Sequence, residues 1–173
     1  MTTPGTTEPE TSGHLTYTLA TVPEVLTSST PQHPQYGRLD ITVTRSRNAP
    51  GSVRCRGITL ELPTGTHPGA LTAQPESIDT TYSATRGRSW HILKNTAHQD
   101  RTLFTCTPEN PRQEAVFDGT WALTLTLDGF PLTTTTGVTA HLRITEDTAT
   151  APASYRTHTI ALPIGTRPAD RNS

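Results

Sequence analysis

The amino-acid sequence predicts an all-β protein, folded as an antiparallel, immunoglobulin-like β-sandwich with an internal pseudo-repeat. Threonines alternate with apolar residues along many short runs, and such alternation is typical of half-buried strands. Turn residues separate the runs at short intervals, and 15 prolines disfavour a mainly helical chain. With 173 residues, the chain is long enough to form one domain with its own core.

The expected strands cover most of the chain. Residues 1–12 are rich in Thr, Pro, Gly and Glu and offer little apolar surface, so we expect a disordered N-terminal tail. The sandwich domain is expected over residues 13–169, a C-terminal tail over 170–173, and one weak helical turn over 110–115. Strands are expected over His14–Ala20, Arg38–Ser46, Val53–Leu62, Ile78–Thr85, Ser89–Leu93, Arg101–Cys106, Trp121–Leu127, Val138–Thr145 and Tyr155–Leu162.

Two hairpins are expected from the order of these strands. Trp121–Leu127 and Val138–Thr145 both alternate cleanly, and a turn-rich segment joins them. If residues 48–51 are the connecting turn, the strands on either side of them form a second hairpin.

Four blocks of sequence recur in the same order. A chance echo within a threonine-rich chain is the alternative, but the blocks also share Ala-Pro pairs, Leu-Pro-x-Gly-Thr-x-Pro runs and arginines. We therefore expect a duplicated unit, with repeat-like halves at about 13–69 and 120–169 and a central insert at about 70–119. The matching blocks are Leu15–Leu19 with Leu123–Leu127, Arg38–Thr42 with His141–Thr145, Ala49–Arg54 with Ala151–Arg156, and Leu62–Pro68 with Leu162–Pro168.

Charge and composition indicate which classes of partner and which cellular compartment to expect. The formal net charge is −1, so we expect no nucleic acid as a partner. We find neither a signal peptide nor an apolar run long enough to span a membrane, and we expect a cytoplasmic protein. Cys55 and Cys106 are then expected as buried thiols rather than a disulfide. Arginine outnumbers lysine 13 to 1, a bias typical of a high-GC bacterial genome.

Candidate chemistry is sparse. His91, His98 and Asp100 lack the spacing and number of ligands of a structural metal site, so we expect no metal and no cofactor. Gly-rich phosphate loops and Gly-x-Ser-x-Gly elbows are absent from the sequence, so no catalytic residue is assigned. An enzyme would require one histidine, among His91, His98, His141 and His158, to meet a carboxylate or a hydroxyl.

Arginines form the clearest candidate binding feature. Four arginines lie on either side of residues 48–51, at alternate strand positions that are apolar farther along each strand. They are Arg45, Arg47, Arg54 and Arg56. Charges at that parity require either a hairpin that projects beyond the core or a bulge that re-aims them. The second copy carries Glu146 and Asp147 in the corresponding stretch. These complementary ends predict head-to-tail association, and an ordinary charged edge is the alternative.

Aromatic residues support a second, weaker alternative. Tyr36 and Phe130 fall in expected loops, where exposed rings would bind a carbohydrate or another small ligand, while Trp90 and Trp121 are expected in the core. The expected function is therefore a non-catalytic binding or assembly module that contacts another protein or a second copy of itself. A carbohydrate-binding or small-molecule-binding sandwich is the first alternative, and a hydrolase with a histidine-based site is the second.

Overall fold

The computed structural model confirms the antiparallel β-sandwich. It consists of two sheets with one short 3₁₀ helix, η1 (Pro75–Ser77), between strands. The description covers residues 6–10, 15–22, 26–27, 29–30, 32–47, 49, 51–85, 89–110, 115–118, 120–133, 137–148 and 154–163. Within these ranges, no helix has the length and apolar character needed to cross a membrane.

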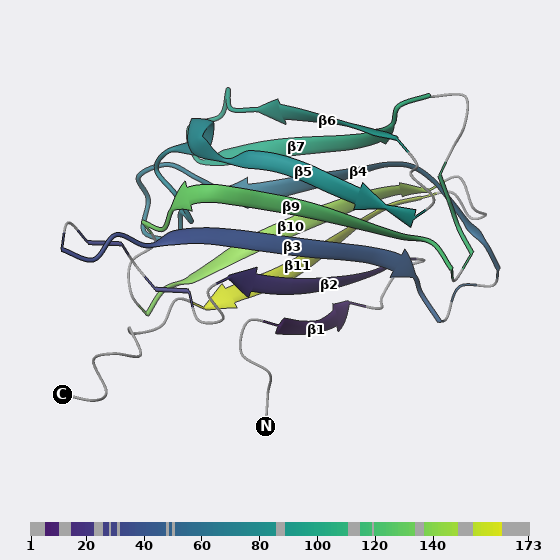
Figure 1. The fold of residues 1–173 in the computed structure, drawn as a ribbon, viewed down its shortest axis with the longest axis horizontal. Helices are drawn as coiled ribbons and strands as arrows, with labels where there is room; N and C mark the ends of the chain where they lie inside the picture. Colours follow the sequence, from purple (N-terminus) through teal and green to yellow (C-terminus); the bar gives the residue numbers. More distant parts are fainter. Residues whose placement is uncertain are drawn as a thin grey trace.

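The first sheet has five strands, all antiparallel to their neighbours. Figure 1 shows this sheet in front of the other one, with its strands in spatial order from top to bottom. In that order they are β5 (Asp79–Ala84), β9 (Ala122–Pro131), β3 (Tyr36–Arg45), β2 (Leu15–Val22) and β1 (Thr6–Glu10).

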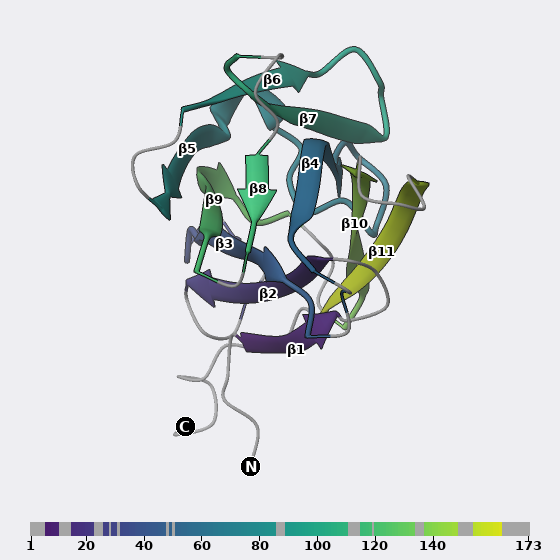
Figure 2. The ribbon, with the colours of Figure 1, turned by 90° about the vertical axis from the view of Figure 1, so that its right-hand side faces the viewer.

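The second sheet has six strands. Figure 2 shows it at right angles to the first view, with β6 and β11 far apart at its two margins. Five strands follow the order β6 (Trp90–Asn95), β7 (Arg101–Pro108), β4 (Val53–Pro63), β10 (Thr139–Thr148) and β11 (Ser154–Pro163), and the short β8 (Ala115–Phe117) also pairs with β4.

The core lies between the two sheets and follows the alternation seen in the sequence. On β2, buried Leu15, Tyr17 and Leu19 alternate with half-buried residues, because successive side chains point to opposite faces. On β10, the buried parity includes Leu142 and Ile144. Threonine occupies many outward positions, where its branched side chain suits a pleated, half-buried surface.

Both expected hairpins are wrong. β9 pairs with β3 and β5 in the five-stranded sheet, whereas β10 pairs with β4 and β11 in the six-stranded sheet. β3 and β4 are likewise in different sheets. Each of these connections crosses from one layer to the other. Alternation predicts an inner and an outer face for a strand, but inner faces look alike in both sheets, so the pattern cannot choose the pairing.

Two short strands were not expected. Thr6–Glu10 forms β1, which pairs with β2, although we expected residues 1–12 to be disordered. Main-chain hydrogen bonds at a sheet edge do not require apolar side chains, so a segment with few apolar residues can still pair as a strand. Ala115, expected at the end of a helical turn, begins β8, and residues 111–114 lie outside the described part. Residues 170–173, expected as a C-terminal tail, also lie outside the described part.

The recurring blocks fall on strands in matching order, but their pairing is not repeated. β2 and β3 pair with each other, whereas their counterparts β9 and β10 lie in opposite sheets. β10 and β11 pair with each other, whereas β3 and β4 do not. The two copies of each block therefore have the same alternation of apolar and polar residues but different strand partners. The duplication stays a prediction from the sequence.

Candidate functional site

The expected arginines lie at the end of the sandwich where β3 ends and β4 begins. Arg47, Arg54 and Arg56 are exposed, and Arg45 is half-buried with its Nη1 donating to the Gly51 carbonyl oxygen at 3.2 Å. We call these four residues the arginine end. The short connection between β3 and β4 keeps them close in sequence, although the two strands belong to different sheets.

A bulge aims the β4 arginines outward. The pairing of β4 with β10 shifts by one residue, because Asp147 lies opposite Gly57 while Thr148 lies opposite Cys55. The extra residue, Arg56, resets the parity of the strand, so that Cys55 is buried and its neighbours face solvent. Of the two arrangements that the sequence allows, the bulge is the one present.

The expected acidic counterpart is divided between the core and the surface. Asp147 faces outward and forms an ion pair with Arg56 of the same chain, at 3.1 Å between Oδ1 and Nη2. Arg56 Nη2 also donates to the Thr148 carbonyl oxygen at 3.5 Å. Glu146 is fully buried and cannot belong to an acidic tip. Adjacent strand residues point to opposite faces, which accounts for the separation.

Glu146 instead joins the two sheets through a buried polar cluster. Its Oε1 accepts the Tyr17 hydroxyl at 3.0 Å and lies 2.9 Å from Nε2 of His158. Tyr17 comes from β2 and the other two come from β10 and β11, so the contact spans the core. The Tyr17 and His158 rings also contact, with centroids 5.0 Å apart. We call these three residues the core triad.

The triad is closed to substrates. All three side chains are buried, and the second carboxyl oxygen of Glu146 has no hydrogen-bond partner among the described residues. Burial raises the pKa of Tyr17 well above its usual value, and the nearby Glu146 carboxyl adds to the rise. A histidine meets both a carboxyl and a tyrosine here, as an enzyme would require, but in the core rather than at an accessible surface.

Sequence reasoning missed the triad, although a signal was present. Glu146 shares the parity of Leu142 and Ile144, and His158 shares the parity of the buried Ile160. A polar side chain in an apolar row predicts a buried hydrogen-bonded group. What the parity cannot supply is Tyr17, which reaches the carboxyl from the opposite sheet.

The two loop aromatics have different environments. Tyr36 is exposed over 62% of its surface, so it stays available for contact. Phe130 is fully buried, and the expectation of an exposed ring is wrong. β9 continues through this residue and pairs Phe130 with Gly37, whose missing side chain leaves room for the ring. Trp90 is buried as expected, and Trp121 is partly buried against the core.

The cysteines are confirmed as buried free thiols. Burial raises the pKa of Cys55 and of Cys106 to about 12. At neutral pH burial therefore favours the protonated thiol, which is the less nucleophilic form. In the described residues, no group of three or more His, Cys, Asp or Glu side chains could hold a metal ion.

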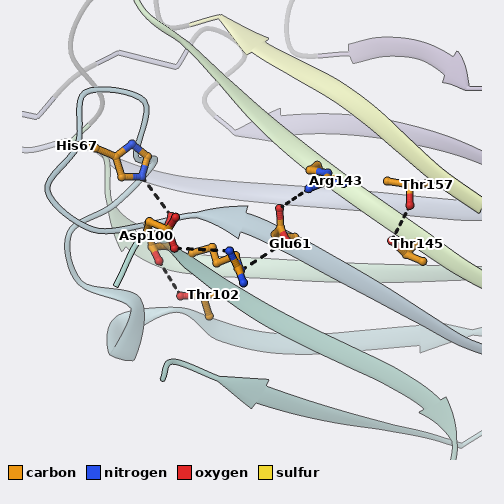
Figure 3. A network of polar contacts seen from close by, with 9 residues as sticks. Glu61, His67, Asp100, Thr102, Arg143, Thr145 and Thr157 are labelled. Carbon is orange, nitrogen blue, oxygen red and sulfur yellow. Dashed lines mark hydrogen bonds and ion pairs between the residues drawn. The ribbon is translucent and has the colours of Figure 1, made fainter. Parts of the chain in front are cut away.

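A network of charged side chains crosses the outer face of the six-stranded sheet (Figure 3). Glu61 lies between two arginines, with Oε2 at 3.3 Å from Arg143 Nη1 and Oε1 at 3.7 Å from Arg101 Nε. Arg101 also lies 3.8 Å from Asp100, whose backbone oxygen is 3.1 Å from Nε2 of His67. The ion pairs are all partly exposed, so they add little to stability.

Comparison with known proteins does not assign a family. No family model and no curated protein matches the chain. One similar solved structure is AvmM, described as catalysing macrocyclization in alchivemycin A biosynthesis, with a TM-score of 0.48, 13% identity and 90% coverage of each chain. Another is a cohesin module from a Clostridium perfringens family 33 glycoside hydrolase, with a TM-score of 0.44, 7% identity and coverage of 96% and 100%. At these scores neither likeness carries an argument about function.

Proposed function

We propose that this protein is a non-catalytic binding module, and that its arginine end contacts an acidic surface of another protein. The observation that supports the proposal is the exposure of Arg47, Arg54 and Arg56, which all lie at the end of the sandwich where β3 ends and β4 begins. Clustered charge of one sign steers an oppositely charged partner and fixes its orientation. Arginine is also enriched at protein interfaces, where its planar donor fork can bind carboxylates bidentately.

The partner in this proposal is a different protein because the expected acidic tip does not exist. Glu146 is buried and Asp147 is already paired with Arg56 within the chain. Head-to-tail association through these acids would need both of them at the surface. The arginine end therefore lacks the counterpart that the sequence analysis assigned to a second copy.

The two alternative functions have less support. A carbohydrate-binding surface around the loop aromatics retains Tyr36 but loses Phe130 to the core. A histidine-based hydrolase would require substrate to reach the core triad, whose side chains are buried. No observation favours either alternative over a protein-binding role.

Retention on immobilised poly-glutamate at increasing salt tests the proposal. We expect the variant Arg47→Ser/Arg54→Ser/Arg56→Ser to elute at clearly lower salt than the wild type, because three exposed cations are lost. A matched control is needed because the substitutions also change the net charge. The control replaces three arginines that lie away from the arginine end, Arg38, Arg101 and Arg143.

The control carries the same net charge as the test variant, so a difference between them isolates the surface. We expect the control to elute at higher salt than the test variant. Equal elution of the two variants would show that retention follows net charge alone, and it would overturn the proposed role of the arginine end.

A further inference from the structure

Strand β6 forms an open edge of the six-stranded sheet. It pairs with β7 on one side, and no described strand pairs with its other side. β6 lies at the upper margin of the protein in both ribbon views (Figures 1 and 2). An open edge presents unpaired main-chain N–H and C=O groups, which can template the addition of another strand.

The hydrogen-bond pattern identifies which groups face outward. The Glu109 N–H donates to the Ser89 carbonyl oxygen at 3.0 Å, and this pair continues the register of β6 with β7. Hydrogen-bonded pairs alternate along an antiparallel ladder, so His91, Leu93 and Asn95 bond to β7. The main-chain groups of the residues between them therefore point to the open side, and those residues are Trp90, Ile92 and Lys94.

The usual protections of an edge strand are absent from β6. The strand has no proline, and its register with β7 runs without a shift. Its only charged residue, Lys94, turns inward and donates to the carbonyl oxygens of Pro75, Glu76 and Ile78 at 3.2, 3.4 and 2.9 Å. Edge strands of soluble proteins are normally blunted by exposed lysines, prolines or bulges. β1, at the edge of the other sheet, carries Pro9 and a register shift.

Side chains on the outer face complete an apolar edge. Leu93, in the middle of β6, is 59% exposed. His91 lies two residues before it on the same face and is also exposed. Together they lie next to the open main-chain groups of the strand.

We propose that β6 pairs antiparallel with β6 of a second copy, so that the six-stranded sheets of two protomers become continuous. A second copy fits because a twofold axis can pass through the middle of the strand, at Ile92. Ile92 then lies opposite Ile92 of the second copy, and Trp90 lies opposite Lys94, so every residue with open main-chain groups meets another. Each of these pairs exchanges main-chain hydrogen bonds. The outer-face residues His91 and Leu93 then face each other across the axis as non-hydrogen-bonded pairs. β6 has no acidic side chain, and its one lysine turns inward, so neither kind of charge opposes this arrangement.

This pairing does not involve the arginine end, and its dependence on salt distinguishes it from binding through those arginines. Multi-angle light scattering on a sizing column at high protein concentration should give twice the 18.7 kDa chain mass, with little change between low and high salt. Leu93→Lys should reduce the mass to that of one chain, because two added ammonium groups meet near the axis. The control Thr157→Lys adds the same charge on the exposed outer face of β11 and should leave the dimer intact.

Cysteine cross-linking tests the register. Non-hydrogen-bonded antiparallel pairs place Cα atoms about 4.5 Å apart, within the range of a disulfide. Under oxidation, His91→Cys and Leu93→Cys should each stay uncrosslinked alone and should form a covalent dimer when mixed. A cross-linked dimer of Leu93→Cys alone would overturn the proposed register. A wild type that is monomeric at all concentrations, or a dimer lost in Thr157→Lys but retained in Leu93→Lys, would overturn pairing through β6.

Discussion

Removing the hydroxyl of Tyr17 should measure how much the core triad contributes to the union of the two sheets. Tyr17→Phe keeps the buried ring and deletes the donor that reaches Glu146 Oε1 at 3.0 Å from the opposite sheet. A hydrogen bond to a carboxyl oxygen contributes about 1–3 kcal/mol, and the loss leaves that oxygen with less than its full set of donors. We expect the free energy of unfolding to fall by about 2 kcal/mol.

Chemical and thermal unfolding can both detect this change. For a domain of 173 residues, 1 kcal/mol shifts Tm by about 2–4 °C, so Tyr17→Phe should lower Tm by about 4–8 °C. Urea unfolding followed by tryptophan fluorescence gives the free energy directly, because Trp90 is buried and unfolding exposes it. The matched control is Tyr82→Phe, which removes a hydroxyl from a ring that is 39% exposed.

The control should change stability by less than about 0.5 kcal/mol, as is usual for surface substitutions. The reasoning is refuted if Tyr17→Phe is as stable as the control. It is also refuted if the slope of the free energy against urea changes while the free energy in water does not, because the substitution would then act on the unfolded state.

Two further predictions concern the thiols and a close packing contact. The fold raises the pKa of Cys55 and Cys106 from 9.0 to about 12, so it favours the protonated thiols. This contribution to stability is complete below pH 9 and is lost as the pH rises toward 12. The urea midpoint should therefore fall as the pH rises from 9 toward 12, and an unchanged midpoint would contradict burial as the cause. Gly37→Ala should destabilise the protein by about 1–3 kcal/mol, because a Cβ there would lie 2.9 Å from the ring of Phe130. Differential scanning calorimetry should show this loss as a lower unfolding temperature. In the control Gly51→Ala, the added Cβ meets open space, and the variant should unfold at the wild-type temperature.

The sequence predicted the strands well because alternation is a local property. The alternation over Trp121–Leu127 places Leu123 and Leu125 on its apolar face, and both are buried. A break in the same alternation explains the error at Phe130. Gly129 interrupts the alternation with a positive φ of 77°, and the pairing of β9 with β3 shifts at this point, so the ring of Phe130 turns inward where a loop was expected.

The candidate site was predictable only in part. The sequence displays the short connection between the strands of Arg45 and Arg54, and this connection places both residues at the same end of the sandwich. The opposite directions of Glu146 and Asp147 follow from strand parity, and attention to that parity would have corrected the expected acidic tip. By contrast, the contact of Tyr17 with Glu146 joins residues 129 positions apart, and no local pattern indicates it.

By itself, the sequence determined the fold class, the positions of most strands and the inner face of each, because side-chain alternation depends only on neighbouring residues. The tertiary structure decided which strands share a sheet, where the bulge at Arg56 resets the parity, and which strands lie at the edges of the sheets. These features depend on hydrogen bonds between segments far apart in the chain. An inward-facing apolar row satisfies either sheet equally well, so the choice between sheets is made only when the whole sandwich closes around its core.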